Sequence, residues 1–340
     1  MPDADLIALD VGGANLKAAD GRGWTHAEPF ALWRDWRRLP DALARILATR
    51  RARRVVATMT GEIADCYASR AAGVAHIVES LVVAARGRAA DVSVYLVDGR
   101  LAPAAEAGRL PHLAAASNWH ALARLAAAHA PAPRSLLVDV GSTTTDVVAL
   151  VNGTPAPLAR DDAGRMLTGE LVYTGAERTP LATLVRALPH GDVIRPVAAE
   201  RFADSRDAWL LVDGLAENAD DHDTADGGPA TRDAARIRLA RTMLLEPADL
   251  SGDAARAAAE RCATVQGRRV AAALRRVVAR HGWCPGGIVL SGHGEALARR
   301  ALALTWPAAP VVSLGDVLGP AVSRVAPAHA LALVARGVLA

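Results

Sequence analysis

The sequence is poor in cysteine and lysine, and it lacks a long uncharged apolar run. Its three cysteines, Cys66, Cys262 and Cys284, form no CxxC pair. Such an odd, scattered set argues against a disulfide framework and is typical of a reducing compartment, so we expect a cytoplasmic protein. The acidic segment 1–5 does not have the pattern of a signal peptide. No uncharged run reaches the roughly 18 to 20 residues that a membrane helix needs.

The charges are nearly balanced, with 39 basic against 36 acidic residues and a net charge of +3. This balance predicts neither a nucleic-acid partner nor a membrane-surface partner. Hydrophobic residues make up 51% of the chain, which excludes a disordered chain and a collagen-like fibre. The 340 residues are enough for two domains, each with a core of its own.

Lysine occurs once, at Lys17, and the other 38 basic residues are arginines. A bias of this kind replaces lysine by arginine wherever a guanidinium is tolerated. We therefore interpret Lys17 as a position that needs a compact ammonium group and does not fit a planar guanidinium. The alternative is that one lysine survived by chance.

A strand–aspartate–glycine pattern occurs twice, in residues 6–12 and again in residues 136–141. Each copy is an apolar run, an aspartate, a glycine with small polar residues, and a second apolar run. The repeat predicts two related α/β domains, 1–132 and 133–318, with a hinge at the prolines of 131–133. We expect the C-terminal helix 319–340 to pack back on the first domain. A helical and polar insert is expected around 200–250.

The two turns of this repeat have the composition of anion sites. Turns of this kind expose backbone N–H groups, which bind anionic oxygens. The candidate phosphate-binding residues are Gly12, Gly13, Asn15, Gly141, Ser142, Thr143 and Thr144. Asp10 and Asp139 are candidate ligands of a Mg²⁺ ion that would neutralise the phosphates, and Lys17 would add its charge. Neither turn matches a dinucleotide-binding or P-loop motif, and a purely structural pair of hairpins is the alternative.

A third glycine turn, Gly292-His293-Gly294-Glu295, follows the predicted strand 286–291 and opens a helix. A helix N-terminus at such a turn attracts anions, so these four residues form a candidate nucleotide-like loop. The order hairpin, hairpin, glycine turn resembles the acetate and sugar kinase, Hsp70 and actin superfamily. The resemblance implies an α/β, two-domain actin-like ATPase fold of ribonuclease H-like type, with the site in an interdomain cleft.

A closer resemblance is carried by several sequence blocks. They are 10–17 (DVGGANLK), 57–66 (ATMTGEIADC), 116–119 (ASNW), 139–146 (DVGSTTTD), 168–175 (TGELVYTG), 178–180 (RTP) and 224–227 (TADG). They resemble the hydantoinase A/oxoprolinase family, and within it the branch of tetrahydromethanopterin-linked C1-transfer proteins.

The resemblance implies a transferase of methanofuran-type cofactor biosynthesis. Its substrates would be an aminomethyl-furanmethanol diphosphate and the phenol of a γ-glutamyl-tyramine or tyrosine-based acceptor. An ether would form and diphosphate would leave. Asp10, Lys17, Asp139 and Asp146 are the candidate catalytic residues, and either Asp139 or Asp146 would take the phenolic proton. Mg²⁺ is the expected cofactor.

Two alternatives stay open at this point. One is an ATP-dependent small-molecule kinase or an amidohydrolase of the oxoprolinase type. The other is a non-catalytic scaffold that senses nucleotide. The oligomeric state also stays open, and a homo-oligomer is compatible with the sequence.

The substrate side has six candidate residues: Thr60, Glu62, Asp65, Asn118, Trp119 and Asp226. Glu62 or Asp65 could bind the aminomethyl cation, or both could be first-turn acids at a helix N-terminus. Trp119 could stack on a furan or phenol ring, or could be a core tryptophan. Asp226 could contact substrate, or could belong to a solvated acidic loop.

Overall fold

The computed structural model describes residues 6–50, 52–89 and 91–339, so the segment 1–5 judged above lies outside the described residues. The chain forms two compact units. The first runs to Ser135 and takes in Val148–Arg165 and the chain from Val312 onward; the second comprises Leu136–Val147 and Met166–Val311. In the described part of the chain, every individual helix is too short or too polar to cross a membrane.

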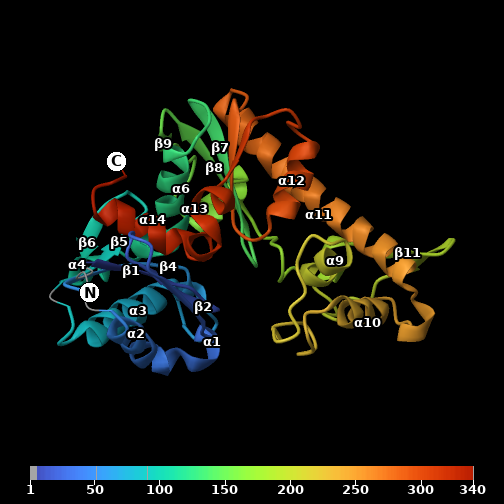
Figure 1. The fold of residues 1–340 in the computed structure, drawn as a ribbon, viewed down its shortest axis with the longest axis horizontal. Helices are drawn as coiled ribbons and strands as arrows, with labels where there is room; N and C mark the ends of the chain where they lie inside the picture. Colours follow the sequence, from blue (N-terminus) through green and yellow to red (C-terminus); the bar gives the residue numbers. More distant parts are fainter. Residues whose placement is uncertain (1–5, 51, 90, 340) are drawn as a thin grey trace. The chain divides into compact units, whose positions relative to one another are not determined.

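The first unit is built on a six-stranded sheet, shown in blue to cyan in Figure 1, in the order β3-β2-β1-β4-β5-β6. Its strands are β1 (Leu6–Val11), β2 (Asn15–Ala19), β3 (Thr25–Pro29), β4 (Arg54–Met59), β5 (Asp91–Tyr95) and β6 (Leu101–Pro103). The first three strands are antiparallel, while β4 is parallel to β1 and β5 to β4. Every residue of β1 is buried, as expected for a central strand that is covered on both faces.

Helices cover both faces of this sheet. The helices of this unit include α1 (Leu32–Asp35), η1 (Trp36–Arg38), α2 (Leu39–Ala48), η2 (Gly61–Ile63), α3 (Arg70–Ala85), α4 (Ala104–Ala107), α5 (Pro111–Ala114), α6 (Asn118–Ala128), α13 (Leu314–Ser323) and α14 (Ala326–Ala335). Figure 1 shows α2 and α3 on one side of the sheet and α14 on the other. The C-terminal helix α14 contacts β1, β2, β4 and α6. The C-terminal segment therefore completes the first unit.

The second sheet repeats this plan in the order β10-β8-β7-β13-β14, with β9 paired to β8. Its strands are β7 (Arg134–Val140), β8 (Thr145–Val151), β9 (Thr154–Pro155), β10 (Leu171–Val172), β13 (Gly287–Ser291) and β14 (Val311–Ser313). In both sheets the first strand is central, with the second and third on one side and the fourth and fifth on the other. This duplicated order confirms the predicted α/β, two-domain actin-like ATPase fold.

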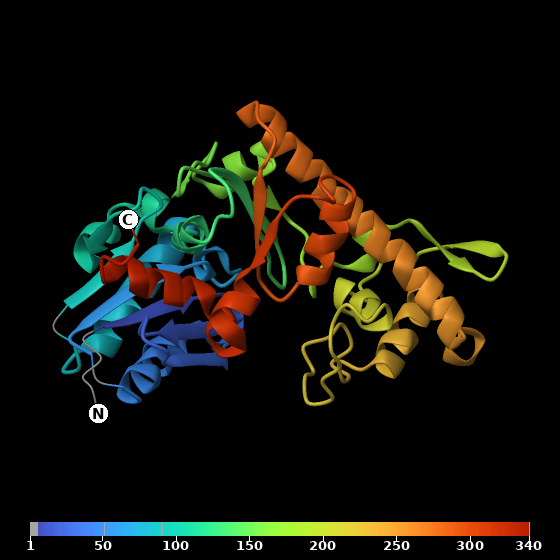
Figure 2. The same cartoon turned by 45° about the horizontal axis from the view of Figure 1, so that its top comes forward.

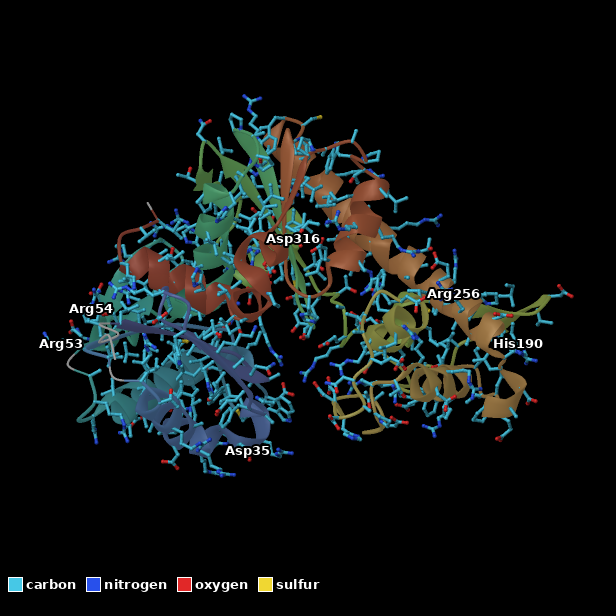
Figure 3. The ribbon with its side chains drawn as sticks, viewed as in Figure 1. Asp35, Arg53, Arg54, His190, Arg256 and Asp316 are labelled. Carbon is cyan, nitrogen blue, oxygen red and sulfur yellow. The ribbon has the colours of Figure 1, made fainter. Side chains whose placement is uncertain are left out.

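The rest of the second unit is mainly helical. It contains α8 (Leu181–Leu184), α9 (Ser205–Leu211), α10 (Arg232–Thr242), η3 (Pro247–Asp249), α11 (Gly252–His281), α12 (Glu295–Ala303) and the two-stranded β11 (Ala187–His190) and β12 (Val193–Pro196). Helix α11, orange in Figure 2, contacts α9, α12 and β11. Near its start, Arg256, labelled in Figure 3, donates to Asp213 at 2.6 Å. A buried apolar cluster joins α8, α9, α10 and α11.

The structure differs from the sequence-based expectation in several places. Segment 148–165, expected in the second domain, groups with the first unit, where Asn152 N–H donates to Pro133 and β9 contacts α6. Helix α7 (Asp162–Thr168) and strands β3, β11 and β12 were not expected. Strands β11 and β12 contain Pro189 and Pro196, a composition that disfavours strands in sequence patterns.

Candidate functional site

The turn between β1 and β2 has backbone donors near an aspartate and a lysine. Asp10 on β1 lies in register with Lys17 on β2, so both side chains project from the same face of the ladder. Gly12 N–H donates to Asn15 at 3.1 Å, and a Cβ atom on Gly12 would lie 2.9 Å from that carbonyl oxygen. Within the described residues of the first unit, the N–H groups of Gly13 and Ala14 have no backbone acceptor. The turn therefore remains a candidate anion site, with two backbone N–H groups available as donors.

Asp10 is a buried carboxylate with one oxygen that makes no hydrogen bond within the described residues. It is 5% exposed, and within the described residues its Oδ1 has no hydrogen-bond partner. Burial raises the pKa of Asp10, while the positive charge of Lys17 opposes this rise. The described residues contain no group of three or more His, Cys, Asp or Glu side chains arranged to hold a metal ion. With its Oδ1 unpaired in the described part of the chain, Asp10 fits the mode in which Mg²⁺ takes one or two carboxylates and completes its shell with water and phosphate oxygens.

A second loop, after β4, packs directly on this turn. Thr60 N–H donates to Val11 at 3.0 Å. A Cβ atom on Gly61 would lie 3.1 Å from the Gly12 carbonyl oxygen and 2.4 Å from a Leu32 methyl carbon. Because β1 and β4 are parallel and in register, the two loops lie at the same edge of the sheet, where ligands bind in many α/β proteins.

Within this loop Glu62 is buried and Asp65 is exposed. Glu62 is 1% exposed, and Arg70 Nε lies 3.8 Å from its carboxylate. Arg70 also donates to Asp162 at 2.7 Å. Burial raises the pKa of Glu62 to about 7, against the lowering effect of the Arg70 charge. Sequence reasoning did not find Arg70 and Asp162, because they are 92 residues apart and no local pattern connects them.

Trp119 is buried in the first unit, and its predicted stacking on a substrate ring stays a prediction. It is 2% exposed, and the guanidinium carbon of Arg165 lies 3.9 Å from its ring centroid. This contact occupies a face of the ring, in a cation–π arrangement. Asn118 accepts the Trp119 N–H at 2.7 Å and so helps to start α6. Arg165 is itself 1% exposed and was not found from the sequence.

In the second unit, the turn between β7 and β8 is held by a neighbouring loop. Gly141 N–H donates to Thr144 at 2.9 Å, and the carbonyls of Gly141 and Ser142 accept the N–H groups of residues 176–178. A Cβ atom on Gly175 would lie 2.5 Å from the Ser142 carbonyl oxygen. The loop approaches so closely that only glycine fits at position 175.

The glycine loop 292–294 meets the same turn. A Cβ atom on Gly292 would lie 2.2 Å from the Val140 carbonyl oxygen and 2.9 Å from Asp139 Oδ1. Gly294 N–H donates to Val140 at 3.1 Å. The structure therefore brings together the predicted Asp139 and the predicted glycine loop. Asp146 lies on β8, in register with Leu171 of β10. Glu295, at the start of α12, accepts a hydrogen bond from Arg299 at 2.7 Å.

A small charged cluster flanks this loop. His293 Nε2 lies 3.6 Å from the carboxylate of Glu177, which also binds Arg206 at 3.0 Å. Burial alone would raise the pKa of Glu177, but His293 and Arg206 lower it to about 2. Arg206 also donates to Asp221 at 2.7 Å. Glu177 and Arg206 were missed in the sequence analysis because their pairing depends on the tertiary fold.

Asp226 pairs with two arginines, and its predicted contact with substrate stays a prediction. Its carboxylate binds Arg238 at 3.0 Å and Arg241 at 2.8 Å. Arg238 is fully buried and also binds Asp207 at 2.7 Å. These arginines, together with the Gly228 N–H, lower the pKa of Asp226 in spite of its partial burial. Asp226 thus anchors its loop to α10.

Comparison with known proteins agrees with the resemblance predicted from the motifs. A family model described as hydantoinase/oxoprolinase matches residues 53–334. Over 241 residues the chain is 29% identical to the (4-{4-[2-(gamma-L-glutamylamino)ethyl]phenoxymethyl}furan-2-yl)methanamine synthase of Methanocaldococcus jannaschii, covering 70% of this chain and 71% of that protein. It is 36% identical over 118 residues to the synthase of the same name from Methanococcus vannielii, covering 35% of this chain and 53% of that protein.

Among solved structures, the ROK hexokinase from Thermus thermophilus is 18% identical, with a TM-score of 0.43. The superposition covers 98% of this chain and 99% of the hexokinase. The second synthase is matched over about half of its length, and the first over more than two thirds. Since the family model spans most of the sequence, from residue 53 to residue 334, this chain belongs to the hydantoinase/oxoprolinase family.

Proposed function

We propose that this chain is a transferase of methanofuran-type cofactor biosynthesis. It joins an aminomethyl-furanmethanol diphosphate to the phenol of a γ-glutamyl-tyramine or tyrosine-based acceptor. The observation that carries the proposal is the β1–β2 turn, where Lys17, the orphaned Asp10 carboxylate and two open backbone N–H groups lie together. Similarity to two synthases of this product class supports it.

In this reaction, the main task of catalysis is to stabilise the diphosphate as it leaves. The bond from the furanylmethyl carbon to the diphosphate oxygen breaks, and its electron pair leaves with the diphosphate. A furanylmethyl carbon tolerates developing positive charge, so stabilising the departing anion lowers the barrier most. In this proposal the Lys17 ammonium and the N–H groups of Gly13 and Ala14 bind the diphosphate oxygens. The phenol oxygen then forms the ether bond as its proton passes to a carboxylate.

Mg²⁺ is part of this proposal: Asp10 would hold it in the first unit, and Asp139 is a separate candidate ligand in the second unit. When bound, the ion would neutralise charge on the diphosphate. In the second unit, the hydroxyl groups of Ser142, Thr143 and Thr144 can donate to phosphate oxygens. Asp65 is exposed and is the better candidate to bind the aminomethyl cation.

The alternative function is an ATP-dependent kinase or amidohydrolase, and the description of the matched family, hydantoinase/oxoprolinase, favours the amidohydrolase. Both functions need a polyphosphate site, so the turns alone do not separate them. A non-catalytic scaffold would retain the turns and show no turnover.

The deciding experiment incubates the purified protein and Mg²⁺ with the furan diphosphate and γ-glutamyl-tyramine, with and without ATP. Mass spectrometry detects the ether, and a phosphate assay follows diphosphate release. Formation of the ether without ATP is the expected result. Consumption of ATP without ether would overturn the proposal in favour of a kinase or amidohydrolase, and no turnover of any substrate would favour the scaffold.

A further inference from the structure

Glu62 is the most unusual polar group of the first unit. Its side chain is 1% exposed, and neither carboxylate oxygen has a partner of full hydrogen-bond geometry within the described residues, although the backbone N–H groups of Glu62 and Ala116 interact with it and lower its pKa. Leaving a buried carboxylate unsatisfied is costly, and native structures rarely do so without a functional reason. Asp10 Oδ1 and Trp119 Nε1 are also buried and without a partner in the described part of the chain.

The backbone around Glu62 is tightly packed. The residue lies three positions beyond the end of β4, at the sheet edge that carries the β1–β2 turn. Gly61 lies against Gly12, and a Cβ atom on Gly73 of α3 would lie 2.1 Å from the Glu62 carbonyl oxygen. Two glycines therefore allow the backbone of this segment to pack tightly on both sides, while the backbone N–H groups of Glu62 and Ala116 interact with the carboxylate.

The charges around Glu62 suit proton transfer better than cation binding. Arg70, from α3, lies 3.8 Å away, and Asp162, from α7, binds Arg70 in turn. Within the described residues, the other segments at this point contribute uncharged groups: Leu32 and Gly12 against Gly61, and the backbone of Ala116. A substrate ammonium at Glu62 would meet the positive charge of Arg70, whereas a neutral hydroxyl would not.

We propose that Glu62 is the catalytic proton acceptor of the transfer. Its carboxylate takes the phenolic proton as the phenol oxygen bonds to the furanylmethyl carbon and the carbon–oxygen bond to diphosphate breaks. Glu62 ends as a neutral carboxylic acid and returns to the carboxylate by releasing the proton to water. The inference rests on the proposed function, and it replaces Asp139 and Asp146 as the base.

The titration of Glu62 supports this role. Burial raises its pKa to about 7, Arg70 opposes the rise and Asp162 adds to it. A general base is most effective when its pKa lies near the working pH, because it is then ionised and still basic enough to accept a proton. A carboxylate of ordinary pKa would be a much weaker base toward a phenol, whose pKa is about 10.

The test uses Glu62→Gln, which keeps the size of the side chain but cannot accept the proton. Three quantities are measured on the full chain: ether formation, diphosphate release without acceptor, and the pH dependence of kcat. The matched control is Glu79→Gln, an exposed acid on α3 outside the proposed machinery. A second acceptor carries several fluorines on its phenol ring. Together they lower the pKa of the phenol enough to make it phenolate at the assay pH.

We expect Glu62→Gln to slow ether formation by about 10²–10⁴-fold, the usual contribution of a general base. Slow release of diphosphate to water should persist, the wild-type rise of kcat through pH 7 should disappear, and the fluorinated acceptor should restore most of the rate. Glu79→Gln should behave as wild type.

Two failures are distinguishable. If the wild-type protein forms no ether, the proposed function fails and Glu62 has no phenol to deprotonate. If the wild type forms ether and Glu62→Gln keeps its rate or its pH profile, the proton-acceptor role is overturned. Equal loss with both acceptors, together with lost diphosphate release, would also overturn it, since that pattern indicates a structural role.

Discussion

The β1–β2 and β7–β8 hairpins occupy equivalent places in their sheets but carry different side chains. In the first, Lys17 lies in register with Asp10, so an ammonium group accompanies the carboxylate. In the second, hydroxyl residues 142–144 form the turn, and the nearby charges of Glu177 and Arg206 bind each other. The first turn can therefore compensate the charge of an anion, while the second can mainly donate hydrogen bonds to it.

The duplicated fold sets the positions of the two turns, whereas the residue types set what each turn can bind. The strand order is repeated, and both turns follow a buried apolar strand that ends in Asp-Val-Gly. The repeated backbone places two turns, and their different side chains suit them to unequal tasks in the proposed function. We therefore expect changes in the first hairpin to affect turnover more than matched changes in the second.

The largest expected effect is at Lys17. Replacing it by Ala should lower kcat for ether formation by about 10²–10³-fold, because one preorganised donor to a developing anion is lost. Lys17→Arg should recover only part of this loss, since a planar guanidinium does not reproduce a compact ammonium. Arg256→Ala, which removes an exposed pair with Asp213, is the control and should leave kcat unchanged. A wild-type rate in Lys17→Ala would contradict the charge assigned to the first hairpin.

The next effect is on stability and comes from Glu62. Its pKa rises from its ordinary value of 4.5 in the unfolded chain to about 7 in the folded protein. The folded state therefore binds more protons between these values, and stability falls as pH rises from 4.5 to 7. The loss amounts to about 3 kcal/mol, at 1.36 kcal/mol per pKa unit.

Glu62→Gln lacks this loss, so its advantage over the wild type should grow between pH 4.5 and 7 and then level off. Urea unfolding at several pH values measures the difference. A constant gap between the two proteins from pH 4.5 to 8 would show that Glu62 titrates normally.

The candidate site was predictable from the sequence where local patterns define it. Both hairpins and the 292–294 loop follow from apolar runs that end in glycine and small residues. The contacts of Arg70 with Asp162 and of Arg165 with Trp119 were not predictable, because each joins segments that only the fold brings together. Trp119 illustrates the limit: a tryptophan at the start of a helix suits either a core or a ring-binding site, and its contact with Arg165 appears only in the fold.

The glycines of the two regions offer a third comparison. Gly292 has a φ of 82°, and a Cβ atom there would lie 2.2 Å from a backbone oxygen, whereas Gly13 has no atom within 4 Å of that point. Gly292→Ala should lower the free energy of unfolding by about 2–3 kcal/mol through strain and overlap. Gly13→Ala should change it by less than about 0.5 kcal/mol. Equal effects in denaturant unfolding would mean that the 292–294 loop is not held against β7.

The smallest effect is expected at Thr143, in the second hairpin. Thr143→Val preserves the shape of the side chain but removes its hydroxyl, which we propose donates to a phosphate oxygen. One such hydrogen bond contributes about 1 kcal/mol, so the KM for the furan diphosphate should rise by roughly fivefold while kcat changes little. Thr183→Val is the matched control, because its hydroxyl donates to the Pro180 carbonyl at an exposed position. A loss of kcat in Thr143→Val as large as that in Lys17→Ala would contradict the distinction between the hairpins. The second turn would then also stabilise the charge that develops as diphosphate leaves.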